Sequence, residues 1–378
     1  MSAIETFSQH PESHVLGTPA QGMAQLLAAV ADRATIHAGG KLVRVIDGPR
    51  QWLMVETSGS SGAPKTIRRS PQSWIASFAV NADLFGVTPA DTYATLGPLA
   101  HSLTLYATLE ALHLGADVLA LAGQNPRNQA QQIVGHDVSV IYATPAQLGL
   151  LLQGLQAAKI DTVAGVQQVF CGGGTLPPAL RSSIASAFPS AQFIEFFGAS
   201  ETSFITMSDD ATPMGSVGKP YPAVDLTVHA GEIWVRSPYL FDGYATGDAS
   251  DTRWDGDALS IGEMGYLDTQ GYLFLRGRKS RMVTVADHNV FPEEIEALIA
   301  THHTCAVIPM PDPKRGHRIV CVLQGHATPD VAALRQLCQI RLGAHAVPKE
   351  FVMIDKIPML PAGKPDTVTL TQWLKDRA

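Results

Sequence analysis

The sequence predicts an α/β protein with a large N-terminal domain and a small α+β C-terminal lid domain. Strand and helix patterns alternate between residues 52 and 197, which predicts mostly parallel sheets flanked by helices. Short strand patterns separated by Gly and Asp follow over 226–276 and predict a β-rich, antiparallel section. A compact α+β pattern closes the chain, so we expect domains at residues 1–279 and 280–378.

The alternating region is expected to begin with a strand at 52–55. A helix then starts near Ser70, a suitable N-cap, with Pro71 in its first turn. Further strands are expected at 118–121, 138–143, 166–171 and 192–197, and helices at 23–31, 128–134, 145–158 and 177–188. Because ligands bind beyond the carboxyl ends of such strands, we expect the loops after Val55, Cys171 and Phe197 to share that edge.

The remainder of the chain carries shorter patterns. Strands are expected at 226–228, 232–237, 272–276, 304–309, 319–324 and 351–354, and helices at 292–299 and 331–342. Glu293 and Glu294 lie in the first turn of the helix at 292–299, where the positive end of the helix dipole stabilises negative charge. A basic cluster at 276–281 separates the two domains.

Composition and charge exclude several classes of protein. Hydrophobic residues make up 46% of the 378 residues, enough for a large core, so wholesale disorder is excluded. The net charge of −7 excludes binding of nucleic acid by bulk charge. The most apolar stretch, 103–123, contains Glu110, His113 and Asp117, so no membrane span is expected.

Targeting signals and cysteines point to the cytoplasm. Residues 1–11 lack the basic and apolar regions of a secretory signal. The four cysteines are widely spaced and form neither a Cys-x-x-Cys pair nor a disulfide framework. We therefore expect reduced thiols in a cytoplasmic protein, with Cys338 as a small core residue.

The loop at 57–65 combines small residues, hydroxyls and a lysine. Small residues let backbone N–H groups approach phosphate oxygens, while hydroxyls and Lys65 add donors and charge. It is not a Walker loop, because Ala63 and Pro64 precede the lysine where that motif has glycine. Taken alone, the loop fits either a phosphate site or a flexible polar connection.

Two further segments carry chemistry. Ser200 and Glu201 follow a predicted strand, and a carboxylate at a sheet edge is a suitable Mg²⁺ ligand, although a solvated turn is the alternative. Lys364 follows Gly363 near the C-terminus, where a lysine on a loop can act as a movable point charge. Neither segment by itself defines a site.

Together these segments resemble the adenylate-forming superfamily of acyl-CoA synthetases, peptide-synthetase adenylation domains and luciferases. Six segments match in the family's order, namely 57–65, 98–101, 173–176, 197–201, 262–278, and 289–296 with 363–364. The resemblance covers about residues 55–364, and it implies an enzyme.

The implied reaction uses ATP, Mg²⁺ and a thiol. A carboxylate would attack the α-phosphorus of ATP, giving acyl-AMP and pyrophosphate, and the acyl group would pass to CoA or to carrier-protein phosphopantetheine. The resemblance implies three catalytic residues: Ser200 at the α-phosphate, Glu201 holding Mg²⁺, and Lys364 neutralising charge in the transition state. Because the protein positions and neutralises charge, no general base is needed.

The resemblance also assigns nucleotide contacts and a hinge. The β- and γ-phosphates would be held by Thr57, Ser58, Gly59, Ser60, Ser61, Gly62 and Lys65. The adenine site would be formed by Gly173, Gly174 and Thr175, with Phe197 stacking on the base and Gly198 following it. Glu263 and Arg278 would address the ribose hydroxyls. Ser280 would be the hinge about which the C-terminal domain rotates.

Departures from the family pattern leave the thiol acceptor open. Glu263 and Phe197 stand where the family has Asp and Tyr. Ala286 and Asp287 stand where the family has a glycine before Asn289, in the segment that approaches the thiol tunnel. This last departure favours a carrier protein, whereas the overall pattern favours CoA.

The acyl substrate is expected to lack an α-amino group, because no acidic residue lies between Leu96 and Tyr106 to hold an amine. The candidate pocket wall comprises His101, Phe170, Cys171, Phe196 and Ala199, which suits an aryl or a short to medium acyl group. The strand residues among them are equally compatible with plain core positions.

Two further expectations concern catalysis and assembly. A catalytically lapsed nucleotide- or partner-binding protein is the alternative class, and retention of Lys65, Glu201, Arg278 and Lys364 argues against it. Only 56 residues precede the phosphate loop, far fewer than in typical relatives. An apolar face exposed by this shortening predicts a homodimer.

Overall fold

The computed structural model describes residues 6–40, 42–58, 64–174, 176–209, 211–247, 251–326, 328–359 and 365–377. The chain divides into two compact units. The larger comprises 1–227, 234–259 and 267–273, and the smaller comprises 228–233, 260–266 and 274–378. The hinge at Ser280 stays a prediction.

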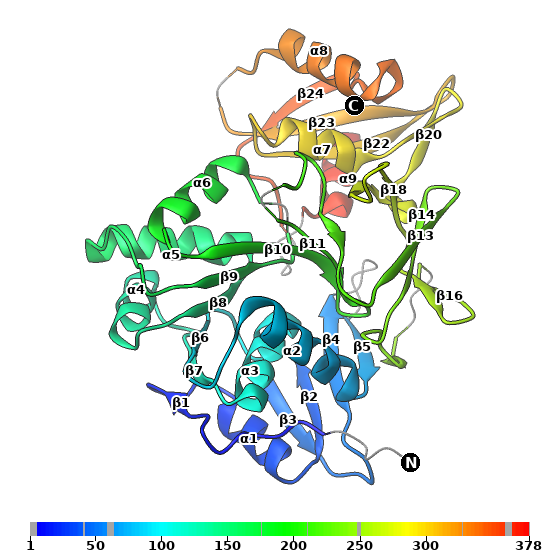
Figure 1. The fold of residues 1–378 in the computed structure, drawn as a ribbon. Coiled ribbons are helices and arrows are strands. Elements are labelled where there is room, and N and C mark those ends of the chain that lie inside the picture. Colours follow the sequence, from blue (N-terminus) through cyan, green and yellow to red (C-terminus); the bar gives the residue numbers. More distant parts are fainter. Residues whose placement is uncertain are drawn as a thin grey trace. The chain divides into compact units, whose positions relative to one another are not determined.

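The larger unit is built on an eight-stranded sheet (Figure 1). Its order is β1 (Val15–Leu16), β7 (Asp117–Ala120), β6 (Thr92–Thr95), β8 (Val140–Ala143), β9 (Gln168–Cys171), β10 (Gln192–Ala199), β11 (Ser203–Met207) and β12 (Lys219–Pro220). The strands from β1 to β10 pair in parallel, and β11 and β12 add antiparallel pairs at one edge. The predicted parallel architecture is confirmed, although β6 was not expected.

Helices cover both faces of this sheet (Figure 1). The helices are α2 (Gln72–Phe85), α3 (Ser102–Leu114), α4 (Pro126–Gly135), α5 (Pro145–Ala158) and α6 (Pro178–Ala187). Thr144 and Gln147 form a reciprocal capping box at the start of α5, with Pro145 in the first turn, so this helix begins and ends where the sequence predicts. Residues of α4, α5 and α6 share a core with Cys171, whereas Phe85 of α2 packs against Phe170.

A second, five-stranded sheet corrects the prediction for the phosphate loop. Its order is β15 (Gly243–Thr246), β5 (Pro64–Arg69), β4 (Leu53–Ser58), β2 (Thr35–Gly39) and β3 (Leu42–Ile46), with α1 (Met23–Ala31) against it. The loop therefore joins the two antiparallel strands of a hairpin, rather than a strand and a helix. Strand β5 was missed because its charged residues, among them half-buried Arg68 beside fully buried Ile67, hide the apolar pattern of a strand.

Two related expectations are also corrected. The loop after Val55 does not lie at the edge of the parallel sheet, because β4 belongs to the five-stranded sheet. Ser70 does not cap α2, since the N-cap residue is Pro71 and no side chain caps this helix. Ser70 instead accepts a hydrogen bond from Ser73 through its carbonyl and donates its N–H to Asp242.

The β-rich section comprises β13 (Asp225–His229), β14 (Glu232–Arg236), β16 (Arg253–Asp255), β17 (Ala258–Ser260), β18 (Glu263–Leu267) and β19 (Leu273–Arg278). The boundary between the two units passes through β14. Within the larger unit Val235 pairs with Leu259, and within the smaller unit Glu232 pairs with Met264, both antiparallel as expected.

The smaller unit has the predicted α+β pattern. Its sheet runs in the order β21 (His288–Val290), β20 (Val283–Val285), β23 (Gly316–Gln324) and β22 (Cys305–Asp312), and β24 (Glu350–Ile354) pairs with β23 in parallel. The helices α7 (Pro292–Ile299) and α8 (Val331–Leu342) share a core with one face, and α9 (Thr367–Lys375) packs on the other. Cys338 is fully buried as expected. Across the described ranges, no helix is long and apolar enough to cross a membrane.

Candidate active site

The turn between β10 and β11 presents Ser200 and Glu201. A Cβ at Gly198 would lie 1.8 Å from the Ser203 carbonyl oxygen, so only glycine permits this close approach. The backbone N–H of Ala199 donates to the Thr202 hydroxyl at 3.0 Å, which closes the turn. Glycine and this hydrogen bond therefore fix where the Glu201 carboxylate emerges.

Glu201 and Lys65 approach the same tyrosine. The Tyr244 hydroxyl donates to Glu201 Oε1 at 2.9 Å, and Lys65 Nζ lies 5.9 Å from the centroid of the Tyr244 ring. Strand β15 pairs with β5, which places Tyr244 opposite Ile67. The fold thus brings together two predicted phosphate-site residues that are more than a hundred positions apart in sequence.

Sequence reasoning missed Tyr244. The residue lies in a short segment after Phe241, Asp242 and Gly243, and no motif marks it. The backbone N–H of Phe241 donates to the Glu201 carbonyl at 2.9 Å, so this segment also supports the turn. Only the pairing of β15 with β5 reveals its role.

The predicted adenine-side residues lie at the carboxyl end of the parallel sheet. Gly173 and Gly174 are exposed just beyond β9, and β9 pairs with β10, which ends in Phe197 and Gly198. A Cβ at Gly172 would lie 2.3 Å from the Phe196 ring, so glycine lets this ring pack over the loop. The structure therefore places both segments at one edge, as the sequence predicts.

The five candidate pocket residues are not all brought together. Phe170 and Cys171 are adjacent in β9, so their side chains lie on opposite faces of the sheet. Phe170 stacks on Tyr142 at 4.3 Å between ring centroids, whereas Cys171 joins the core beneath α5 and α6. Phe196 packs against Phe204 at 4.8 Å. His101 is the exposed residue before α3, and Ala199 is half-buried.

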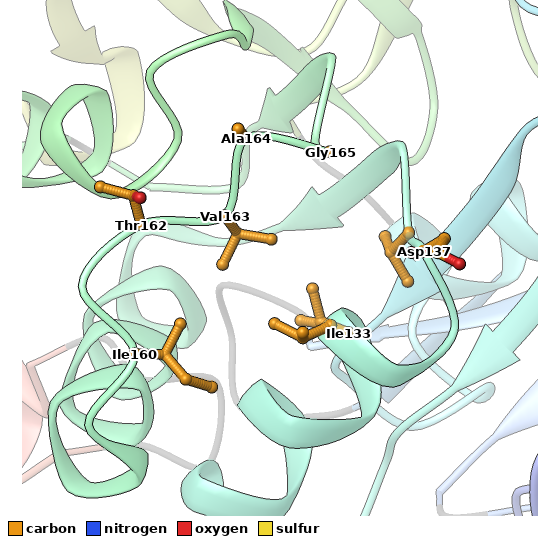
Figure 2. Close-up of a pocket in the computed structure, with 9 residues that line it drawn as sticks. Ile133, Asp137, Ile160, Thr162, Val163, Ala164 and Gly165 are labelled. Atoms are coloured by element: carbon orange, nitrogen blue, oxygen red, sulfur yellow. The ribbon is translucent and has the colours of Figure 1, made fainter.

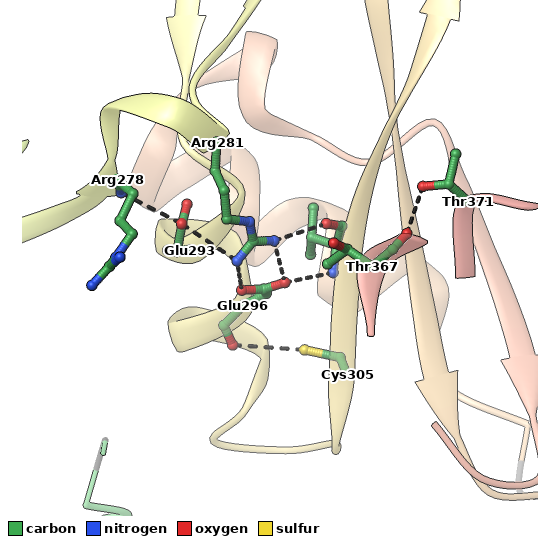
Figure 3. A network of polar contacts seen from close by, with 8 residues as sticks. Arg278, Arg281, Glu293, Glu296, Cys305, Thr367 and Thr371 are labelled. Atoms are coloured by element: carbon green, nitrogen blue, oxygen red, sulfur yellow. Dashed lines mark hydrogen bonds and ion pairs between the residues drawn. The ribbon is translucent and has the colours of Figure 1, made fainter. Parts of the chain in front are cut away.

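The predicted ribose pair and hinge lie in the smaller unit. Arg278 Nε lies 3.0 Å from Glu263 Oε1, and the carboxylate is mostly buried. Ser280 lies within a short 3₁₀ turn, Lys279–Arg281. Arg281 makes ion pairs with Glu293 and Glu296, as Figure 3 shows.

Burial sets the electrostatics of this network. It raises the pKa of Glu293, and the nearby Arg281 guanidinium opposes that rise. The Arg278 N–H also donates to Glu293. The residues before and after Ser280, Arg278 and Arg281, are therefore both bonded to carboxylates of α7.

The turn that departs from the family pattern is strained. Ala286 and Asp287 join β20 to β21 as a two-residue hairpin loop with φ of 48° and 65°. Both angles lie in the left-handed region, which costs about 1–2 kcal/mol for a residue with a Cβ. Two non-glycine residues therefore occupy positions where glycine would adopt the same backbone conformation without strain.

Several predicted residues lie outside the described ranges: Gly59, Ser60, Ser61, Gly62, Thr175 and Lys364. The strand positions flanking the phosphate loop are described, with Thr57 paired to Lys65 and Ser58 to Pro64. The ends of that loop are therefore fixed in register by the hairpin.

A surface pocket near α4 does not coincide with the candidate site. Figure 2 shows Ile133, Asp137, Ile160 and Val163 around it. Asp137 precedes β8 and Gly165 precedes β9, so the pocket lies at the amino ends of these strands. The glycine loop and Glu201 lie beyond the carboxyl ends.

The residues present fit a magnesium ion that arrives with a nucleotide. Among the described residues, no group of three His, Cys, Asp or Glu side chains is placed to hold a metal. Mg²⁺ is usually held by one or two carboxylates together with substrate phosphates. The single carboxylate of Glu201, beside Lys65, matches that donor set.

Comparison with known proteins identifies the family. Residues 52–245 match the family model described as AMP-binding enzyme, and residues 294–364 match AMP-binding enzyme C-terminal domain. The first match spans just over half of the chain. The chain therefore belongs to the AMP-binding enzyme family, and it is a ligase of the adenylate-forming superfamily that its motifs resemble.

Curated relatives are similar over most of their length. An uncharacterized acyl-CoA ligase (YhfT) of Bacillus subtilis is 29% identical over 350 residues, covering 88% of this chain and 70% of the relative. The 2-succinylbenzoate–CoA ligase of Bacillus subtilis is 25% identical over 342 residues, covering 85% and 68%.

Solved structures confirm the fold. The amide bond synthetase McbA of Marinactinospora thermotolerans superposes with a TM-score of 0.74 at 24% identity, covering 88% of this chain and 71% of that protein. The o-succinylbenzoate CoA synthetase of Bacillus subtilis, in complex with an acyl-adenylate intermediate, gives 0.73 at 24% identity, covering 86% and 69%.

Proposed function

We propose that the protein activates a carboxylic acid with ATP and transfers the acyl group to a thiol, CoA in the first instance. The convergence of Lys65 and Glu201 on Tyr244, in a member of this family, carries the proposal. A carboxylate oxygen bonds to the α-phosphorus, and the bond to the bridging oxygen of pyrophosphate breaks. The thiol then attacks the acyl carbon, AMP leaves, and the thiol proton passes to solvent.

Catalysis would rest on positioning and charge neutralisation. Lys65 and the hairpin loop from Thr57 would hold the β- and γ-phosphates, and Ser200 would contact the α-phosphate. Glu201, oriented by Tyr244, would hold Mg²⁺, which neutralises phosphate charge when bound. Removing one such contact typically lowers the rate by about 10²–10³.

The smaller unit would complete the site in turn. Lys364 would neutralise charge during adenylation, and Arg278 with Glu263 would address the ribose. Rotation about Ser280 would then exchange this arrangement for one that admits the thiol. The ion pairs of Arg281 would keep the segment rigid on the side of α7.

We propose an acid without an α-amino group, of aryl or of short to medium acyl type. Glu110 is the carboxylate of α3, and it is wholly buried and bonded by Asn81, Tyr93, Tyr106 and Tyr142. These bonds engage both of its oxygens, which leaves it poorly suited to hold a substrate ammonium group. Aromatic side chains on the Phe170 face of the sheet favour a flat or compact acyl group.

The thiol acceptor has one supported candidate and one alternative. Relatives named as CoA ligases support CoA. The strained Ala286–Asp287 turn supports a carrier-protein phosphopantetheine as the alternative.

Location and assembly complete the proposal. All four cysteines are free, which supports a cytoplasmic reaction. A homodimer is supported by Leu42, Val45 and Ile46, which are exposed on β3 at the edge of its sheet. A monomer by light scattering at micromolar concentration would contradict the dimer.

ATP–pyrophosphate exchange tests the function. We expect exchange that depends on Mg²⁺ and on one class in a panel of aromatic, short and medium acids. Adding CoA or a holo carrier protein to the active acid then identifies the acceptor by thioester formation. Silence across the whole panel, with ATP still bound, would favour the lapsed nucleotide-binding protein instead.

A further inference from the structure

A buried arginine ties the phosphate-loop hairpin to the Glu201 turn. Arg69 is the last residue of β5 and has 0% relative exposure. Its guanidinium donates from Nη2 to the Ser200 carbonyl at 2.5 Å and from Nη1 to the Ser203 hydroxyl at 2.8 Å. These two acceptors flank Glu201 in the sequence, so one side chain holds both ends of the turn.

The remaining contacts of Arg69 explain why an arginine is needed. Nη1 also donates to the Ser73 hydroxyl at 3.1 Å and to the Tyr239 carbonyl at 3.2 Å, and the guanidinium carbon lies 5.1 Å from the centroid of the Trp74 ring. A planar fork reaches acceptors in several directions, whereas a lysine ammonium is a single point. The turn is therefore fixed by a geometry that lysine cannot reproduce.

Trp74 strengthens the same connection. Its indole Nε1–H donates to the Ser203 hydroxyl at 3.0 Å, so this oxygen receives bonds from both Trp74 and Arg69. The backbone of Ser203 is left-handed, with φ of 55°. Such a conformation in a non-glycine residue persists only where surrounding contacts hold it.

The charge of Arg69 has no directly paired carboxylate among the described residues. Its hydrogen-bond acceptors are carbonyls and hydroxyls, and its Nε–H finds no partner in the described part of the chain. Burial lowers the pKa of Arg69 to about 10, opposed by the charges of Glu201 and Asp242, so the group stays protonated at neutral pH. A buried cation beside the turn adds positive potential where a polyphosphate would bind.

We infer that Arg69 is a positioning residue for adenylation: from β5, which also carries Lys65, its guanidinium fixes the Ser200–Ser203 turn and so the place of the Glu201 carboxylate. This inference rests on the proposed function. It predicts that Arg69 acts on Mg²⁺·ATP through Glu201, without touching the nucleotide.

Neighbouring arginines provide the experiment. We would compare Arg69→Lys and Arg69→Gln with the control Arg68→Gln, since Arg68 lies on the opposite face of β5 and stacks on Trp52. Circular dichroism and thermal melting establish folding, and pyrophosphate exchange is then measured against ATP and Mg²⁺. We expect folded Arg69→Lys to lose exchange at least tenfold and to need severalfold more Mg²⁺ for half-saturation, with Arg68→Gln unchanged.

Two further variants separate positioning from general stability. Ser203→Gly removes the shared hydroxyl while keeping a residue at ease with the left-handed backbone, so it should reproduce part of the Mg²⁺ effect even if Arg69→Gln fails to fold. Arg69→Lys combined with Glu201→Gln should lose no more than the worse single variant, because both act at one point.

Three results would overturn the inference. Folded Arg69→Lys with unchanged exchange and Mg²⁺ dependence would remove it while leaving the proposed function in place. Losses that multiply in the double variant would show that Arg69 acts independently of Glu201. A wild-type protein without exchange would overturn the proposed function, and this inference with it.

Discussion

The buried carboxyl of Glu110 makes stability depend on pH in a direction opposite to that of most acids. Asn81, Tyr93, Tyr106 and Tyr142 all donate hydrogen bonds to it. Burial nevertheless raises its pKa to about 7, with these bonds opposing the rise. Burial also raises the pKa values of the three bonded tyrosines well above their usual range, so they remain neutral.

The sign follows from proton linkage. The folded protein holds the Glu110 proton up to about pH 7, whereas the unfolded chain releases it near the usual glutamate pKa of 4.5. Folding is therefore favoured at low pH, and this contribution is lost as pH rises from about 4.5 to about 7. The difference between the two pKa values corresponds to about 3 kcal/mol of stability at this wholly buried site.

Glu110→Gln removes the titration and tests this reasoning. We expect the variant to be less stable than wild type by about 1–2 kcal/mol near pH 5, because in either orientation its amide N–H₂ replaces an oxygen that accepts two of these hydrogen bonds. The difference should shrink as pH rises, reach zero between about pH 6 and 7, and be reversed above pH 7. The assay is urea unfolding of both proteins from pH 5 to 8.5, and other titrating groups cancel in the comparison.

A matched control and a clear refutation accompany this test. Glu12→Gln removes one negative charge at an exposed position and serves as the control for the loss of a carboxylate outside the core. A free-energy difference between Glu110→Gln and wild type that stays constant within about 0.5 kcal/mol over the whole range would refute the argument, because linkage requires it to change.

Three other changes test separate parts of the molecule. Ala286→Gly should raise the free energy of unfolding by about 0.5–1 kcal/mol, because glycine adopts the left-handed backbone without strain. The control Ala297→Gly, in α7, should lower it by about 1 kcal/mol. If denaturant titrations gave the same change for both variants, the turn would not be strained. Gly198→Ala should reduce exchange by about 10² or more, because its Cβ would meet the Ser203 carbonyl; normal exchange by a folded variant would show that the turn adapts. Lys364→Ala should lower the rate of ATP–pyrophosphate exchange by about 10²–10³, while calorimetry should show that ATP binding is largely retained. A loss of ATP affinity by the same factor would count against a role of Lys364 in the transition state.

Local signals explain which elements could be predicted from the sequence. Helix α5 has the predicted bounds because Thr144, Pro145 and Gln147 encode its start within four residues. The helices α7 and α8 also have the predicted bounds: Pro292 opens α7, and the Asp330 side chain caps the start of α8. Strand β5 was missed because a buried arginine in a strand looks, in sequence, like solvated charge.

The candidate site was predictable only where its chemistry sits in a motif. Glu201 and Lys65 stand in segments whose residue types indicate phosphate chemistry. Tyr244 and Arg69 carry no such signal, because their roles arise from the pairing of β15 with β5 and from burial. Similarly, Phe170 and Cys171 are consecutive residues of a strand, so their side chains point to opposite faces of the sheet. They cannot both line one pocket, although both were predicted from the sequence to do so.

In the hairpin of β4 and β5, the packing of the core and the orientation of Lys65 depend on the same strand register. Lys65 and Arg69 are four positions apart, so in a strand of period two they share a face with fully buried Ile67. A slip of one residue in the hairpin would turn Arg69 outward, bury Arg68, and rotate Lys65 away, all at once. A change in the number of residues between Ser58 and Pro64 that alters the pairing would therefore be opposed by the whole core beneath. Selection for a stable interior is here also selection for the correct orientation of a lysine.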